Sequence, residues 1–186
     1  MDTPALSPTR LRHSFSAMLF IFQGTLAATG FIVAYLQEQG MSTTQVGIVM
    51  SFSSVVMMAA PPLWGMLADK LRSIRRVFAL CLVLAAVCYG LTPLASRLSG
   101  ASVLVMSVIL TLAAFFRAPT ASLMDNWIVH TARQIPGLSY GPIRLWGSIG
   151  YALISYALMY LVTWLSLSSS FYFYGLTAVA AILLCR

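Results

Sequence analysis

Three charged side chains stand inside or beside apolar stretches of the sequence: Arg117, Asp125 and Arg144. Arg144 begins a stripe of residues spaced by three and four, the spacing that places side chains on one face of a helix. The stripe continues with Gly147, Ser148, Tyr151 and Ser155. A guanidinium offers a planar set of donors to a carboxylate, a phosphate or paired hydroxyls, and an aromatic ring nearby stacks on a flat solute. The stripe favours recognition of a small organic solute; the alternative is an arginine that extends to the lipid headgroups.

Asp125 and the adjacent Asn126 are the candidate partners of this arginine. Asp125 follows Arg117 by eight residues, which is about 12 Å along a helix. An ionised group inside a hydrocarbon core costs at least ~2.5 kcal/mol. Arg117 and Asp125 are therefore expected either to line a wet cavity or to reach the membrane surface.

The same residues give no support for an enzyme. An intramembrane serine protease needs a histidine base beside its serine, and a zinc protease needs a His-Glu-x-x-His set. The two histidines, His13 and His130, lie at the ends of the predicted spans, and no such ligand set occurs. We predict no catalytic residues, no metal and no cofactor, and we expect the three cysteines to be small buried hydrophobic residues.

The elements that must position these residues follow from the composition. Of 186 residues, 60% are hydrophobic and 8% are charged, which excludes a soluble globular domain. Five stretches of 19 to 41 residues lack Asp, Glu, Lys and Arg. About 20 apolar residues cross a bilayer as a helix, and the longest stretch is divided by a polar turn at residues 165–170. We predict one all-α domain over residues 1–186, with spans at about 14–36, 44–67, 77–96, 101–125, 144–164 and 170–185.

The basic residues predict the orientation of these spans. One side collects Arg10, Arg12, Lys70, Arg72, Arg75, Arg76, Arg133 and Arg186, and the other side has Arg97. Positive residues favour the cytoplasmic side, so we expect both ends of the chain to be cytoplasmic in an inner or plasma membrane. The net charge of +7 is then explained by orientation and by anionic lipid, and no nucleic-acid partner is expected.

A loop signature lies between the second and third predicted spans. It reads Gly65-x-x-x-Asp69-Lys70 and is followed by Arg75-Arg76. Gly65 and Asp69 are one turn apart on a helix, and a glycine there lets another helix approach closely. The alternative is a plain helix end followed by a basic loop.

This loop resembles the signature loop of the major facilitator superfamily, with Arg72 in the place of a family glycine. The segment from Tyr140 to Ala152 resembles the start of the fifth helix in lactose-permease-like and phenylpropionate-permease-like members. The resemblance implies a six-helix half of a twelve-helix bundle, built as a 3+3 inverted repeat. It also implies secondary transport of a sugar or an organic acid, with proton coupling residues in the other half.

In that subgroup a carboxylate late in helix four pairs with the arginine of helix five, and the arginine and an aromatic residue contact the solute. Asp125, or Asn126 if the alignment is shifted by one residue, corresponds to the carboxylate. Arg144 corresponds to the arginine and Tyr151 to the aromatic residue. The partners implied are a solute, membrane lipid, a proton, and either a second six-helix half or a second copy of the chain. The alternative is a membrane scaffold or a truncated product without activity of its own.

Overall fold

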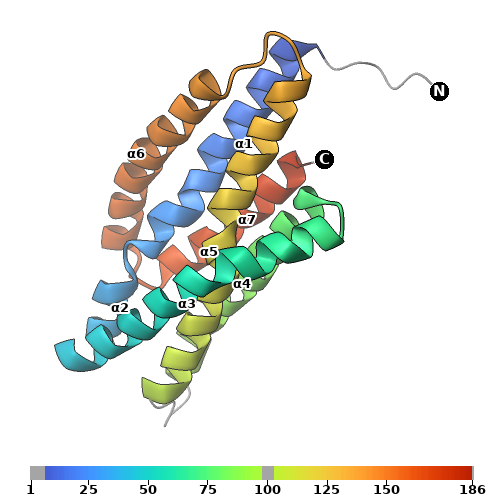
Figure 1. Ribbon diagram of the computed structural model, residues 1–186. Helices are drawn as coiled ribbons and strands as arrows, with labels where there is room; N and C mark the ends of the chain where they lie inside the picture. Colours follow the sequence, from blue (N-terminus) through green and yellow to red (C-terminus); the bar gives the residue numbers. More distant parts are fainter. Residues whose placement is uncertain (1–6, 98–102, 186) are drawn as a thin grey trace.

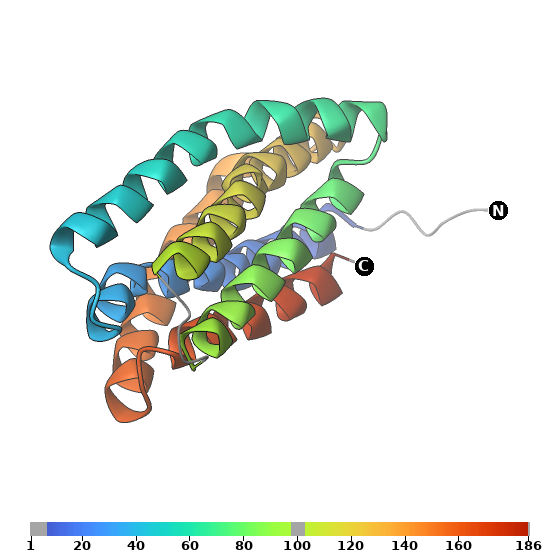
Figure 2. The same ribbon diagram turned by 90° about the horizontal axis from the view of Figure 1, so that it is seen from below.

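Every regular element in the described part of the chain is an α-helix. The computed structural model describes residues 7–97 and 103–185. The helices are α1 (Pro8–Thr29), α2 (Ile32–Glu38), α3 (Thr43–Lys70), α4 (Ile74–Arg97), α5 (Val103–Gln134), α6 (Tyr140–Trp164) and α7 (Ser169–Leu184). Figures 1 and 2 show them as a bundle of rods that run back and forth between two ends of the molecule.

Five helical stretches are long and apolar enough to cross a membrane. Helices α1 and α2 count as one of them, Pro8–Glu38, because only a tight turn at Gly30 and Phe31 separates them. The other four are α3, most of α4, α5 and α6. The all-helical membrane class predicted from the composition is therefore confirmed. The span predicted at 170–185 is α7, an apolar helix of 16 residues.

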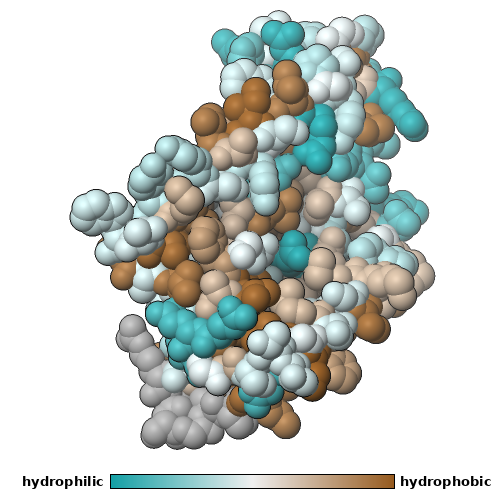
Figure 3. All heavy atoms as spheres, turned by 90° about the vertical axis from the view of Figure 1, so that its left-hand side faces the viewer, coloured by the Kyte–Doolittle hydropathy of each residue, from teal (hydrophilic) through white to brown (hydrophobic). Residues whose placement is uncertain are grey.

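The surface also fits a membrane environment. Large apolar side chains point outward from several helices; Met58 is 78% exposed and Trp164 is 84% exposed. In Figure 3, apolar and weakly polar side chains fill most of the middle of the face in view, whereas strongly hydrophilic side chains gather mainly near the top and the right-hand edge. Water would not tolerate so much exposed apolar area, but a bilayer would.

Two groups of connections lie at opposite ends of the bundle (Figure 1). The start of α1, the α3–α4 turn, the α5–α6 connection and the end of α7 lie at one end. The α2–α3 and α6–α7 connections lie at the other. Among the predicted landmarks, Arg186 and residues 101–102 fall outside the described residues, as does the side chain of Arg97.

Some helix ends differ from the predicted spans. Helix α5 continues to Gln134, beyond the predicted end at 125, and α6 begins at Tyr140 rather than at 144. The prediction ended the one span at Asp125 and began the other at Arg144, but a helix can continue past the hydrocarbon core into the headgroup region. Asp125 consequently lies within α5 rather than at its end.

Backbone groups at helix ends and bends are satisfied locally. Ser42 and Gln45 form a reciprocal capping box at the start of α3. Within the spans, hydroxyls donate to carbonyls of the preceding turn, as Thr25 does to the Phe22 carbonyl oxygen at 2.7 Å. In lipid no water is available to these groups, so such bonds satisfy polar side chains inside the bundle.

The packing centres on α1 and α5. Helix α1 packs on α6 and α7, α5 packs on α3 and α4, and α4 packs on α7. The approach of α1 to α6 is close at a glycine, because a Cβ added to Gly150 would lie 2.6 Å from the Phe20 carbonyl oxygen. A second close approach joins α1 to α7, where a Cβ on Gly24 would meet the Thr177 methyl group at 2.8 Å. Small residues thus set the helix spacing, as is usual in membranes.

We predict that Gly150→Ala destabilises the bundle, because the added methyl group would clash with the backbone of Phe20 and push α1 away from α6. The expected loss is about 1–3 kcal/mol, the usual cost of overpacking. The melting temperature of the detergent-purified chain measures it. Gly65→Ala is the matched control, since no neighbouring atom lies within 4 Å of a Cβ at Gly65. If both variants melt at the same temperature, the close approach at Gly150 is not what holds α1 to α6.

Candidate functional site

Tyr140 of α6 lies near Asp125 of α5 and Arg144 of α6, although α6 packs mainly on α1 and makes only a small contact with α5. The Tyr140 hydroxyl is near enough to interact with both the Asp125 carboxylate and the Arg144 guanidinium. All three side chains are partly buried. Tyr140 and Arg144 are four residues apart, so they share one face of α6. No carboxylate–guanidinium contact of 4 Å or less occurs within residues 7–97 and 103–185, so the predicted direct pair of Asp125 and Arg144 is not formed; Tyr140 is the group near both.

A glycine makes room for the Arg144 side chain. A Cβ added to Gly147 would lie 3.0 Å from Nη1 of Arg144 and 3.0 Å from the Leu19 side chain. Gly147 is buried, so the guanidinium lies against α6 near the place where α1 crosses it. The arginine is thereby held beside the bundle instead of extending freely.

The other members of the stripe differ in exposure. Tyr151 is 48% exposed and Ser148 is exposed, as is Asn126 on α5. Ser155 is partly buried, and its Oγ has no hydrogen-bond partner in the described part of the chain. The stripe therefore carries hydroxyl groups and, about two turns along α6 from Arg144, an aromatic ring.

Arg117 lies apart from this cluster. It points into the bundle, where Nη2 donates to the Met57 sulfur at 3.3 Å. The buried hydroxyls of Tyr89 and Tyr174 are near enough for electrostatic interaction with the Arg117 guanidinium. Arg117 and Asp125 are eight residues apart, which is about 12 Å along α5. The described structure shows no direct Asp125–Arg144 ion pair; the two residues share Tyr140 as a neighbour, and Arg117 contacts Met57 instead.

The signature loop forms a compact turn. The amides of Arg72 and Ser73 donate to the Asp69 and Ala68 carbonyls at 3.1 and 3.2 Å. This pair of bonds is a Schellman motif, whose C′ position takes a left-handed backbone. Arg72 occupies that position with φ 48°, which no other non-glycine residue does within the described ranges. The geometry explains why the resemblance has a glycine there.

The remaining loop residues lie on the surface. Asp69, Lys70, Arg75 and Arg76 are exposed. The close helix approach predicted at Gly65 is absent, because no neighbouring atom lies within 4 Å of a Cβ there. Asp69, Arg72 and Arg75 instead line a hollow of about 450 Å³ with Trp127 and His130 of α5.

Sequence reasoning missed one residue of the cluster, Tyr140. The signal was available, since Tyr140 lies four residues before Arg144 on the same helical face. It was missed because the span was begun at the arginine. Among described residues, no group of three or more His, Cys, Asp or Glu side chains is placed to hold a metal ion.

Comparison with known proteins gives a consistent result. Residues 13–186 match the family described as "MFS_1 like family". The chain is 31% identical over 168 residues to the maltose permease of Geobacillus stearothermophilus, covering 90% of this chain and 41% of the permease. It is 30% identical over 154 residues to the "uncharacterized transporter YwbF" of Bacillus subtilis (strain 168), covering 80% of this chain and 37% of that protein. The chain thus spans about two fifths of these relatives. They are a transporter and a permease, which confirms that this chain is not an enzyme.

We predict that Arg72→Gly stabilises the chain, because a left-handed backbone costs a non-glycine residue roughly 1–2 kcal/mol. Added flexibility in the unfolded state offsets part of this gain, so about 1 kcal/mol is expected. Arg76→Gly removes the same charge from the first turn of α4, where no left-handed backbone is relieved, and it should not raise stability. Thermal unfolding of both variants measures the difference. A fall in the melting temperature of Arg72→Gly would contradict the account of this turn.

Proposed function

Because the chain belongs to the MFS_1 like family, we propose that it forms a six-helix half of a secondary transporter for a small organic solute. The cluster of Asp125, Tyr140 and Arg144 carries this proposal. Asp125 and Arg144 supply an acceptor and a set of donors, and Tyr151 supplies a stacking surface. Asn126 and Ser155 add free polar groups on the neighbouring surfaces.

A 3+3 inverted repeat is supported by the way the helices pair. Let α1 with α2, α3 and α4 be the first three units, and α5, α6 and α7 the second three. The pairing of α1 with α6 then corresponds to that of α5 with α3, and α1 with α7 corresponds to α5 with α4. The contact of α4 with α7 corresponds to itself. In this arrangement α7 is the sixth span, and the end with the α3–α4 turn is cytoplasmic in the cell membrane.

A sugar is the first candidate solute. Paired hydroxyls fit a carboxylate and a guanidinium that are held near each other, and the Geobacillus relative is named a maltose permease. An organic acid is the second candidate, because no carboxylate lies within 4 Å of Arg144 in the described structure, which leaves its charge available to an anion. Arg117, whose Nε has no partner in the described residues, is a candidate for a deeper contact.

We predict that Asp125→Asn and Arg144→Gln each abolish uptake while membrane abundance stays unchanged. Loss of a charge-assisted hydrogen bond lowers affinity by about 10- to 100-fold. Uptake of radiolabelled maltose and of 3-phenylpropionate is measured in cells that express the complete reading frame. Arg133→Gln, an exposed residue at the end of α5, is the control. Normal uptake in either site variant would contradict the assignment.

We also predict that the purified 186-residue chain in vesicles does not accumulate either solute under a proton gradient. In this proposal the solute lies between two halves, and the coupling residues belong to the second half or to a second copy. Proton-dependent accumulation by the purified chain as a monomer would refute the half-transporter proposal. No uptake by the complete protein of any solute would instead favour a scaffold without transport activity.

A further inference from the structure

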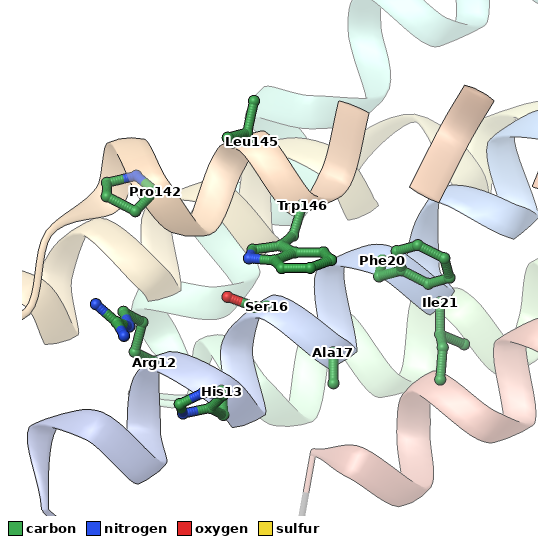
Figure 4. A pocket seen from close by; sticks show the side chains of 9 residues that line it. All are labelled: Arg12, His13, Ser16, Ala17, Phe20, Ile21, Pro142, Leu145 and Trp146. Carbon is green, nitrogen blue, oxygen red and sulfur yellow. The ribbon is translucent and has the colours of Figure 1, made fainter. Parts of the chain in front are cut away.

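A groove of about 710 Å³ runs between α1 and α6, away from the solute cluster. Figure 4 shows Arg12 and His13 near one end of the groove and Phe20 and Ile21 near the other, with Trp146 between the two helices. Arg12 and His13 belong to the first two turns of α1. The groove therefore begins at the basic end of the bundle and continues toward the apolar middle.

The groove and the solute cluster lie on opposite sides of α6. Trp146 follows Arg144 by two residues, about 200° around the helix axis, so the two side chains leave α6 in nearly opposite directions. The buried face of α6, which includes Gly147 and Gly150, separates them. If the Arg144 side faces the solute path, as the proposed function requires, the Trp146 side faces the lipid.

The chemistry of the groove changes along its length. Among the described residues, the lining carries no acidic side chain, and its cationic group, Arg12, is at the end where the headgroups would be. The Nδ1 of His13 is engaged with the Thr9 carbonyl oxygen at 2.7 Å, which leaves its other ring nitrogen available. Ala17, Phe20, Leu145 and Trp146 give the remainder an apolar wall.

We propose that this groove binds one anionic phospholipid of the cytoplasmic leaflet. Arg12 contacts the phosphate, and an acyl chain lies along Ala17 and Phe20 against Trp146. The charge of the rim complements an anionic headgroup, and basic pockets between helices on this side of a membrane bind such headgroups. The volume is that of a pocket for one small molecule rather than for a second helix. The site is separate from the solute cluster and fixes the contact of α1 with α6 from outside.

The test uses the full chain in mixed micelles with brominated phosphatidylglycerol or brominated phosphatidylcholine. The bromine atoms quench tryptophan fluorescence when an acyl chain lies against the ring. We expect phosphatidylglycerol to quench more strongly at equal mole fraction, and this excess to disappear in Trp146→Phe. Arg12→Gln should weaken the excess about fivefold in lipid concentration, the effect expected of one basic residue at an anionic surface.

Two matched controls separate the groove from general charge and bulk. Arg10→Gln removes a nearby charge outside the groove and should keep the excess, as should Ser14→Phe. Ala17→Phe fills the groove and should abolish the excess quenching by phosphatidylglycerol. Soluble glycerol phosphate should not compete, since a free phosphate lacks the acyl chain; competition by it would reduce the site to a phosphate site and overturn the lipid proposal.

The remaining outcomes are equally decisive. Equal quenching by both lipids would overturn the proposal, and so would an excess that survives both Arg12→Gln and Ala17→Phe. No quenching of Trp146 by either lipid, together with a dimer in light scattering, would mean that a second copy covers the groove. Measured without solute, Arg144→Gln should leave the excess unchanged, so the lipid proposal is tested independently of the solute proposal.

Discussion

The close crossing of α1 over α6 is the contact on which the rest of the arrangement depends. Gly150 brings the two backbones together, and Gly147 keeps space for both Leu19 and the Arg144 guanidinium. Gly24, also in α1, allows a similar close approach to Thr177 of α7. Lipid gives helices little hydrophobic reason to associate, so close packing at small residues has to hold the bundle. The position of Arg144 is then a consequence of packing, since the side chain occupies space that a larger residue at 147 would take.

A second constraint is the cost of polar groups in a dry environment. Arg117 is near the centre of the bundle, with the Met57 sulfur and two tyrosines beside it, and its Nε is unsatisfied in the described structure. The Tyr174 hydroxyl is likewise buried without a partner. Buried polar groups inside a membrane protein usually belong to a functional site, where they interact with another charge or with a solute. The Asp125, Tyr140 and Arg144 cluster differs, because it holds a carboxylate as well as a guanidinium near one tyrosine hydroxyl.

The helical membrane class was predictable from the sequence, and the chemistry of the site was predictable in part. Charge-free stretches reveal spans because ions are excluded from hydrocarbon, but they do not reveal where a helix ends in the headgroup region. That is why α5 extends past Asp125 and why Tyr140 was left outside its span. Glycine spacing predicted a close approach at Gly65, yet the approach occurs at Gly150 and Gly24. Spacing along one helix says which residues share a face, but not which face meets a neighbour.

Helix α6 can serve two environments because a helix presents different residues at intervals of about 100°. One side carries Arg144, Ser148 and Tyr151, the opposite side carries Trp146, and the glycine face between them is occupied by α1. A movement of α6 against α1 would alter both sides together, because Gly150 leaves no gap in which one helix can shift alone. A lipid in the groove would then favour one α1–α6 geometry. Solute affinity at Arg144 would depend on lipid through that shared contact, in proportion to the difference in lipid affinity between the two geometries.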